Sequence, residues 1–338
     1  MGKLIFGANV ICAFLLVLSF VLPYVPPKSF PTISLLSLAV SPLILLNIIF
    51  LLYWLLRRKK KLLVSGLILV IAYFHFNPFL EFGSSGTVED YNNSLKVLTY
   101  NVRLFNAYEK EAKDDVLPQL SLLLEEQAPD VICIQEYYKK THLNLAAYPY
   151  QYIYYKDENA NMGHAIVSKY PFSDKGSLDF HKTFNNGLFV DVVKNNDTIR
   201  VYNIHLQSLG ISPTVTSIQK GDKERLRKRL ARTFVKQQEQ LELIASHKEN
   251  TKHPIIITGD FNNTPFSYTY HALQKDMNDA FVERGSGLGT TFKFDGYPMR
   301  IDYMLSSKSL DVINFTTIKE SFSDHYPLVA TFGWPSKE

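Results

Sequence analysis

The sequence predicts a layered α/β (α+β) domain that follows three transmembrane helices. Three apolar segments occupy the first 80 residues, short β-branched runs alternate with helical segments from Leu95 onward, and polar residues stand at the ends of these runs. Alternation of strands with helices is typical of domains in which helices cover a sheet. With 338 residues and 46% hydrophobic content, the chain can bury the core of such a domain.

The apolar segments are residues 4–22, 33–56 and 62–80, and each is close to the ~20 residues that cross a bilayer. A cleaved signal peptide is the alternative for the first segment. Its end, residues 23–27 (PYVPP), lacks a small-x-small cleavage pattern, and two further apolar segments follow. We therefore predict a membrane anchor over residues 1–80 with three transmembrane helices.

Charge is divided unevenly between this anchor and the rest of the chain. Residues 1–80 contain seven Lys or Arg and no acid, whereas the remainder has 29 basic and 32 acidic residues. A slightly acidic body argues against general affinity for nucleic acid, because duplex-binding proteins usually neutralise phosphates with a basic domain. Cys12 and Cys133 give no pattern of a disulfide framework.

A basic cluster, residues 57–61 (RRKKK), separates the second and third apolar segments. Short loops of this kind are retained on the cytoplasmic side of a membrane. Three crossings then predict a multi-pass inner-membrane protein whose C-terminal domain faces the periplasm or the outside. Residues 81–94 have the Gly, Ser, Asn and acidic composition of a linker, which leaves residues 95–338 for the domain.

Polar residues mark the ends of the predicted strands, and residues 116–127 and 223–246 are predicted helices between them. The polar residues are Asn101 after KVLTY, Glu136 after VICIQ, His205 after RVYNI, Asp260 and Asn262 after IIIT, Asp302 after Arg300-Ile301, and Asp324 with His325 before PLVAT. One Asp or Asn after a strand often only caps a turn. Six such places predict a common site along one edge of a sheet.

These residue types predict metal-dependent chemistry. Carboxylate and amide oxygens are hard ligands suited to Mg²⁺ or Mn²⁺, and the sequence has no Cys/His cluster with zinc spacing. The two histidines can bind phosphate oxygens or transfer protons near neutral pH. Hydrolysis of a phosphate ester needs a cation to neutralise the phosphoryl oxygens and a positioned water molecule. The residues at the strand ends can bind such a cation and position such a water molecule.

The ordered series TYNV, IQE, NIHL, GDFN, RIDY and SDH resembles the endonuclease/exonuclease/phosphatase superfamily. This superfamily includes DNase I, abasic-site endonucleases, neutral sphingomyelinases and inositol-polyphosphate 5-phosphatases. The resemblance extends over essentially all of the chain beyond the linker. It implies a four-layer sandwich, with two mixed β-sheets face to face and helices outside.

The resemblance also implies the metal ligands. Asn101 and Glu136 would hold Mg²⁺ or Mn²⁺, with Glu136 as the principal ligand. Asp324 would support the site or bind a second metal.

Catalytic roles follow from the same resemblance. Asp260 would orient or deprotonate the attacking water, and Asn262 would bind a phosphoryl oxygen. His205 would donate a hydrogen bond to a phosphate oxygen. Asp302 would orient His325, which stabilises the transition state or acts as an acid or base.

Two residues are weaker candidates for substrate binding. His164 lies in GHAIVSKYP, which resembles a strand that packs beside the site in this superfamily, and the alternative is an ordinary hydrogen-bonded or solvated histidine. Arg103 stands two residues after Asn101, where abasic-site enzymes have an acid, and IHLQ replaces their Y-x-P-N motif. Abasic-site repair is therefore not expected.

Residues 220–236 contain eight Lys or Arg, with Leu226, Leu230 and Phe234 at a spacing of four. This pattern predicts an amphipathic helix with a basic face. The face is either ordinarily solvated or an arm that contacts anionic lipid head groups or a polyanionic substrate.

Together these features predict a metal-dependent phosphodiesterase or phosphatase that acts outside the cytoplasm. A phospholipid head group is favoured as substrate, because anchoring concentrates the enzyme at the membrane surface. The alternatives are a nuclease for external DNA or RNA, with a steep salt dependence, and a catalytically inactive, membrane-tethered binding module. The complete set of reactive residues argues against the last.

Overall fold

The computed structural model describes residues 2–76, 80–109, 116–211, 214, 222–295 and 297–335. The chain forms two compact units. The first, here called the anchor unit, comprises Met1–Phe79, Asp222–Gln238 and Asn263–Ala272. The second, the α/β unit, comprises Leu80–Gly221, Glu239–Asn262 and Leu273–Glu338. The anchor unit thus contains two segments from the second half of the chain in addition to the predicted anchor.

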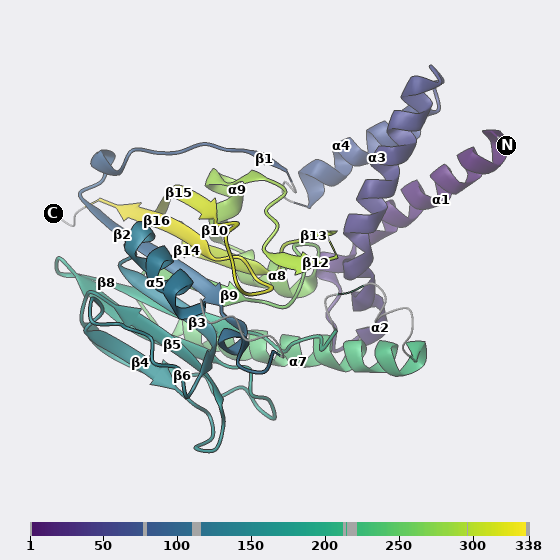
Figure 1. The fold of residues 1–338 in the computed structure, drawn as a ribbon. Helices are drawn as coiled ribbons and strands as arrows, with labels where there is room; N and C mark the ends of the chain where they lie inside the picture. Colours follow the sequence, from purple (N-terminus) through teal and green to yellow (C-terminus); the bar gives the residue numbers. More distant parts are fainter. Residues whose placement is uncertain are drawn as a thin grey trace. The chain divides into compact units, whose positions relative to one another are not determined.

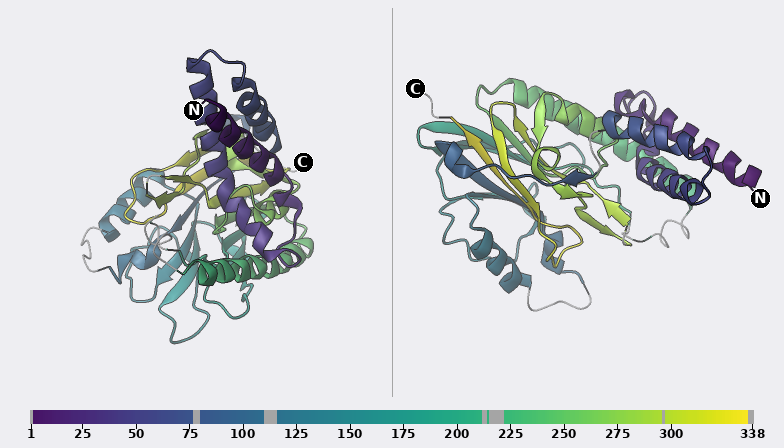
Figure 2. Two further views of the ribbon diagram at one scale, coloured as in Figure 1. Left: turned by 90° about the vertical axis from the view of Figure 1, so that its right-hand side faces the viewer. Right: turned by 90° about the horizontal axis from the view of Figure 1, so that it is seen from above.

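Three apolar helices, α1 (Gly2–Ser19), α3 (Val40–Leu56) and α4 (Leu62–His75), lie side by side in the anchor unit (Figure 2). The short helices η1 (Leu22–Tyr24), α2 (Pro31–Ser34) and η2 (Leu35–Ala39) connect α1 to α3. The helical segments Gly2–Tyr24 and Pro31–Leu56 are long and apolar enough to cross a membrane.

The second and third predicted spans differ from the observed helices. Residues 33–39 form α2 and η2 rather than the start of one long α-helix, since Pro42 has no N–H and its ring clashes with the carbonyl four residues earlier. The third helix, α4, ends at His75, and with 14 residues it is shorter than the predicted span. Asn77 precedes Pro78, and a residue before proline disfavours the helical conformation. Residues 77–79 lie outside the described residues.

A buried polar cluster joins the three apolar helices. The amide Nδ2 of Asn9 in α1 donates to Oγ of Ser65 in α4 at 2.6 Å, and Nε1 of Trp54 in α3 donates to Oδ1 of Asn9 at 2.9 Å. Ser65 in turn donates to Oδ1 of Asn47 at 3.1 Å. Polar groups buried between apolar helices need hydrogen-bond partners, because burial without one costs free energy. These bonds therefore favour one packing of the three helices.

The basic cluster of residues 57–61 lies at one end of the three apolar helices of the anchor unit, and the end of α4 lies at the other. At one end, Nζ of Lys61 lies 4.5 Å from the centre of the Phe6 ring. At the other end, Nε2 of His75 lies 2.7 Å from the carbonyl oxygen of Phe20. The basic cluster of residues 57–61 therefore shares an end with the start of α1.

The segment Asn263–Ala272 packs at the end of the anchor unit opposite the basic cluster. The rings of Phe266 and Phe76 lie 5.0 Å apart. Oγ1 of Thr264 donates to the carbonyl oxygen of Ser37 at 3.2 Å.

Two six-stranded mixed sheets pack face to face in the α/β unit (Figure 1). The first has the order β15-β16-β2-β3-β5-β4 and the second β10-β14-β9-β8-β7-β6. The strands of the first sheet are β2 (Asn93–Asn101), β3 (Val131–Tyr138), β4 (Tyr150–Tyr154), β5 (Met162–Ser168), β15 (Asp311–Thr317) and β16 (Leu328–Trp334). Those of the second are β6 (Phe172–Ser177), β7 (Gly187–Lys194), β8 (Asp197–His205), β9 (Ile255–Asp260), β10 (Met277–Asp279) and β14 (Asp302–Ser307).

Helices cover the outer faces of both sheets. Leu120 and Leu124 of α5 (Val116–Gln127) are buried in the apolar cluster on the outer side of the first sheet. On the second sheet, His247 of α7 (Lys223–Glu249) lies 2.7 Å, through Nδ1, from the hydroxyl of Tyr202. The predicted sandwich of two mixed sheets flanked by helices is confirmed, and both predicted helices are present.

The remaining elements are short. They are η3 (Val88–Asp90), η4 (Arg103–Asn106), α8 (Tyr268–Gln274) and α9 (Ala280–Arg284), and the two-stranded pairs β1 (Glu81–Phe82) with β11 (Ser286–Gly287) and β12 (Phe292–Phe294) with β13 (Tyr297–Met299).

The directions of the strands place the predicted site residues at the same edge of the two sheets. The parallel pairs β2/β3 and β8/β9 end together, so Asn101 and His205 lie at strand ends as predicted. Asp302 instead begins β14, and it reaches the same edge because β14 is antiparallel to β9, with Asp302 opposite Asp260. His325 precedes β16, which is antiparallel to β2.

Candidate active site

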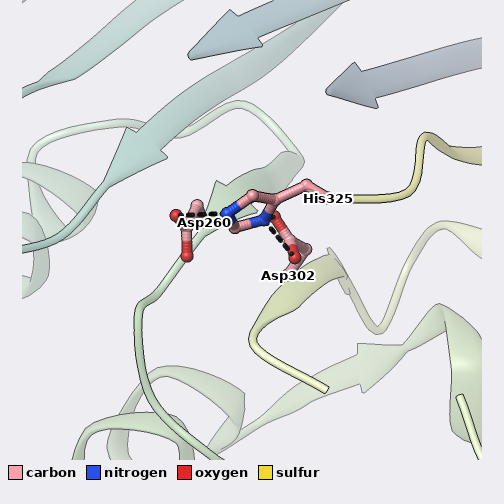
Figure 3. A group of neighbouring side chains, drawn as sticks. All are labelled: Asp260, Asp302 and His325. Carbon is pink, nitrogen blue, oxygen red and sulfur yellow. Dashed lines mark hydrogen bonds and ion pairs between the residues drawn. The ribbon is translucent and has the colours of Figure 1, made fainter. Parts of the chain in front are cut away.

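Asp302 and His325 form a buried pair at the strand edge (Figure 3). Nδ1 of His325 lies 3.0 Å from Oδ2 and 3.1 Å from Oδ1 of Asp302. On the opposite side of the ring, Nε2 lies 3.8 Å from Oδ2 of Asp260. Burial lowers the pKa of His325, but the carboxylates of Asp302 and Asp260 outweigh burial and raise the pKa to about 10. The ring is therefore an imidazolium at neutral pH.

Asp260 lies at the centre of the cluster and is 1% exposed. Its Oδ2 accepts from Nδ2 of Asn101 at 3.1 Å and from Nδ2 of Asn262 at 3.0 Å, and its Oδ1 accepts from the Asn262 backbone N–H at 2.8 Å. Burial raises the pKa of Asp260 to about 8, against the lowering effect of His325. A neighbouring cation would favour its ionised form.

The glycine of the GDFN motif is required by geometry. Gly259 has φ of +124°, and a Cβ there would lie 2.0 Å from the carbonyl oxygen of Ile204 on β8. Only glycine allows β9 to approach β8 this closely at the residue before Asp260.

Glu136 is turned into the site by a β-bulge. The register between β3 and β5 shifts between Ile134 and Tyr137, and Glu136 has φ of +55°. Its Oε1 accepts from Nδ2 of Asn101 at 3.2 Å. Burial raises the pKa of Glu136, and His325 and Asn101 oppose this effect. Left-handed φ values at non-glycine residues cost energy and are concentrated at functional sites.

Two neutral histidines stand beside this pair of carboxylates. Nε2 of His205 lies 3.6 Å from Oδ2 of Asp260 and 3.8 Å from Oε1 of Glu136. Its Nδ1 lies 3.3 Å from Nε2 of His164. Burial lowers the pKa of His164 to about 3 and that of His205 well below its ordinary value. We infer that His164 donates to Nδ1 of His205, which leaves the N–H of Nε2 directed at the carboxylates.

His164 is 1% exposed and lies behind His205. Its Nε2 contacts His205, and direct contact of His164 with substrate stays a prediction.

Arg103 and Asp324 form the more exposed side of the site. Nε of Arg103 lies 3.6 Å from Oδ2 of Asp324, and Nη2 lies 2.7 Å from Oε1 of Glu109. Residues 103–106 all have φ between +47° and +56°, so the chain makes a left-handed turn directly after β2. The N–H of Arg103 donates to Oδ1 of Asn101 at 3.0 Å and so fixes the amide of that residue.

The site offers two groups of possible metal ligands. Asp260, Asp302 and His325 have ligand atoms within 4.8 Å of one another. In this group, Nδ1 of His325 already faces the Asp302 carboxylate at 3.0 Å, and this pairing leaves only Nε2 of the ring for a ligand. The carboxylate oxygens of Glu136 and Asp260 form the second group, and such hard donors fit Mg²⁺ or Mn²⁺. Asn101 turns its Nδ2 toward both carboxylates, so its Oδ1 would join them as a ligand after rotation of the amide. Two carboxylates that share one amide donor, both with raised pKa, would be stabilised by a divalent cation.

Sequence reasoning missed the polar residues that support the site. Nε2 of Gln135 donates to Oδ1 of Asn203 at 2.6 Å, and Asn203 Nδ2 donates to the carbonyl oxygens of Ile134 and Ala165, which connects the two sheets beneath the site. Oγ of Ser323 donates to the carbonyl oxygen of Asn101 at 2.8 Å. The available signal was a polar residue inside each apolar strand, VICIQ and RVYNI.

The model of the Endonuclease/Exonuclease/phosphatase family matches residues 98–325, and a family described as a domain of unknown function matches residues 2–79. No match was found among curated proteins.

Several solved structures share the fold. An endonuclease/exonuclease/phosphatase family protein from Bacteroides thetaiotaomicron is 17% identical, with a TM-score of 0.57 over 72% of this chain and 99% of that one. The human Nocturnin catalytic domain with bound sulfate is 19% identical, with a TM-score of 0.52 over 71% and 93% of the two chains. TDP2 from D. rerio, complexed with a single-strand DNA product, is 16% identical, with a TM-score of 0.55 over 72% and 100%.

Proposed function

The chain belongs to the endonuclease/exonuclease/phosphatase family, and on this premise we propose that it is a membrane-anchored, divalent-metal-dependent phosphoester hydrolase that acts outside the cytoplasm. The observation that carries the proposal is the buried cluster around Asp260. Asn101, Asn262, His205 and His325 all approach this one carboxylate within 3.8 Å.

Glu136, Asn101 and Asp260 would hold the metal, and Asp324 is the candidate for supporting it or a second ion. The chemistry that Mg²⁺ or Mn²⁺ supplies at such ligands is neutralisation of phosphoryl charge and activation of water. Asp260, oriented by the backbone N–H of Asn262, accepts the proton of the attacking water.

The remaining residues stabilise charge. The N–H of His205 donates to a phosphoryl oxygen. Nδ2 of Asn262, which here donates to Asp260 and to the carbonyl oxygen of Leu206, would exchange one of these acceptors for a phosphoryl oxygen of the bound substrate. The imidazolium of His325, held by Asp302, stabilises the charge that develops as the ester bond breaks. Arg103 stands at the exposed side, where a second anionic group of a substrate can reach it.

The outward orientation is supported by the anchor unit. Residues 57–61 lie at the same end as the start of α1, and the segments 222–238 and 263–272 pack at the other end. Because basic clusters are retained in the cytoplasm, three crossings would place the residues after 80 outside it. A C-terminal fusion at Glu338 tests this orientation. An alkaline phosphatase reporter should be active there, and activity of a reporter that works only in the cytoplasm would refute the orientation.

A phosphoester of a lipid head group is the proposed substrate, since the anchor raises the effective concentration of the site at lipid surfaces. The test uses the full chain in nanodiscs, with Mg²⁺, with Mn²⁺ and with EDTA. The substrates are bis-p-nitrophenyl phosphate, plasmid DNA and mixed phospholipids. Metal-dependent release of head groups supports the proposal. Cleavage of plasmid alone, with a steep salt dependence, would instead indicate the extracytoplasmic nuclease, and no turnover at all would indicate the inactive binding module.

A further inference from the structure

The first half of α7 presents a basic stripe, defined by Arg225, Lys228, Arg229, Arg232 and Lys236. At 3.6 residues per turn, spacings of three and four place these side chains on one face of the helix. The opposite face is apolar, and Leu230 and Phe234 on it are buried. Arg225, Lys228, Arg229 and Arg232 are exposed.

The positive charge of the stripe is poorly balanced within the chain. Glu224 accepts from Arg227 at 2.8 Å and lies 3.4 Å from Lys228. Within the described ranges, no carboxylate pairs with Arg225, Arg229 or Arg232. Basic residues near the N-terminus of a helix also oppose the helix dipole. The charges of the stripe therefore do not stabilise α7. This favours a role of the stripe in binding an anionic partner.

The stripe belongs to the anchor unit, at the end that lies opposite residues 57–61. Nη1 of Arg227 donates to Oγ1 of Thr32 at 2.9 Å, and Oε1 of Gln238 accepts from the backbone N–H of Lys28 at 2.8 Å. The connection between α1 and α3 at this end also exposes large apolar side chains, namely Tyr24, Phe30 and Leu36. Exposed aromatic residues at the ends of apolar helices are typical of the membrane interface.

We propose that the basic stripe binds the anionic head groups of the phospholipids that surround the anchor. The stripe and the apolar connection lie at the same end of one compact unit, as an interfacial helix requires. This proposal rests on the membrane location in the proposed function and deepens it, because it names the class of lipid that the anchor unit binds.

The test uses the full chain in nanodiscs of phosphatidylcholine alone and of phosphatidylcholine with phosphatidylglycerol. Hydrogen–deuterium exchange of residues 222–238 is measured in both, for the wild type and for a variant with Arg225→Gln, Arg229→Gln and Arg232→Gln. A matched control replaces three exposed lysines of the α/β unit, Lys140, Lys252 and Lys308, by Gln. Turnover of bis-p-nitrophenyl phosphate is measured in parallel and reports on the proposed function separately.

The expected result is slower exchange of this segment in the anionic nanodiscs, for the wild type and the control, with protection reduced by roughly fivefold for each arginine removed. Added salt should reduce the protection. Equal exchange in the two lipid compositions, or unchanged protection in the arginine variant, would overturn the proposal. Protection by a single-stranded oligonucleotide in phosphatidylcholine nanodiscs, without protection by the anionic lipid, would overturn it in favour of nucleic acid.

Discussion

Both carboxylate oxygens of Asp302 lie within 3.1 Å of Nδ1 of His325, and this carboxylate faces the ring nitrogen opposite the one that approaches Asp260. Asp302 thus fixes the orientation of the ring and compensates its charge in a buried place. Without such a partner, burial would favour the neutral form of His325.

Replacement of Asp302 by Asn removes the charge that stabilises the imidazolium and keeps the size of the side chain. We expect kcat to fall by roughly 10²- to 10⁴-fold, with little change in KM, since the lost interaction acts in the transition state. Steady-state kinetics of the full chain measure this effect. The matched control is Asp276→Asn, at an exposed turn. A loss in Asp302→Asn no larger than in the control would contradict the role assigned to the pair.

Glu136→Gln tests the metal site without reference to activity. In the wild type, added Mg²⁺ or Mn²⁺ should raise the thermal unfolding temperature, because an ion that binds only the folded state stabilises it. The variant loses one carboxylate ligand, and we expect the thermal shift to disappear at the same ion concentration. Glu239→Gln, at an exposed position of α7, should keep the full shift. A full shift in Glu136→Gln would place the ion elsewhere.

Gly259→Ala is expected to destabilise the α/β unit strongly. Its Cβ would clash with the Ile204 carbonyl, and its φ of +124° is unfavourable for alanine. Gly287 also has a positive φ, of +72°, but a Cβ there meets nothing within 4 Å. The free energy of unfolding should therefore fall by about 3 kcal/mol more in Gly259→Ala than in Gly287→Ala. Chemical denaturation measures both, and equal losses would show that the close approach of β8 and β9 is dispensable.

His164 should make stability depend on pH. Its pKa is about 3 in the folded chain, below the ordinary value of 6.5, so the unfolded chain binds the extra proton as pH falls below about 6.5. Stability is thus fully present above that pH and decreases towards pH 3, by about 1.4 kcal/mol per pH unit for this histidine. His164→Gln should have a slope smaller by this amount between pH 6 and pH 4.5 in EDTA. His142→Gln, at an exposed position, is the control, and identical slopes in the two variants would contradict the assignment.

The strand-end residues could be predicted from the sequence because each follows or precedes an apolar run, and strand direction alone carries them to one edge. Asn101, His205 and Asp260 needed no further information. The bulge at Glu136 and the left-handed turn after Asn101 could not be predicted, since tertiary contacts impose those φ values on residues that normally avoid them.

Which segments of the chain form the anchor unit could not be predicted from the sequence either. Phe266 and Phe234 look like ordinary core residues of the domain, yet both segments that contain them cluster with residues 1–79. Periodicity shows that a side chain is buried but does not identify the surface that covers it. The early end of α4 is different, because Pro78 lies three residues after His75 and marks the end of the helix in the sequence.

The most direct test of the central claim is removal and restoration of the metal in the full chain. We predict that EDTA abolishes hydrolysis of bis-p-nitrophenyl phosphate, that excess Mg²⁺ or Mn²⁺ restores it, and that neither ion restores it in Glu136→Gln at the same concentration. Hydrolysis that persists in EDTA, or that Glu136→Gln retains at the wild-type rate, would contradict a metal-dependent hydrolase built on these residues.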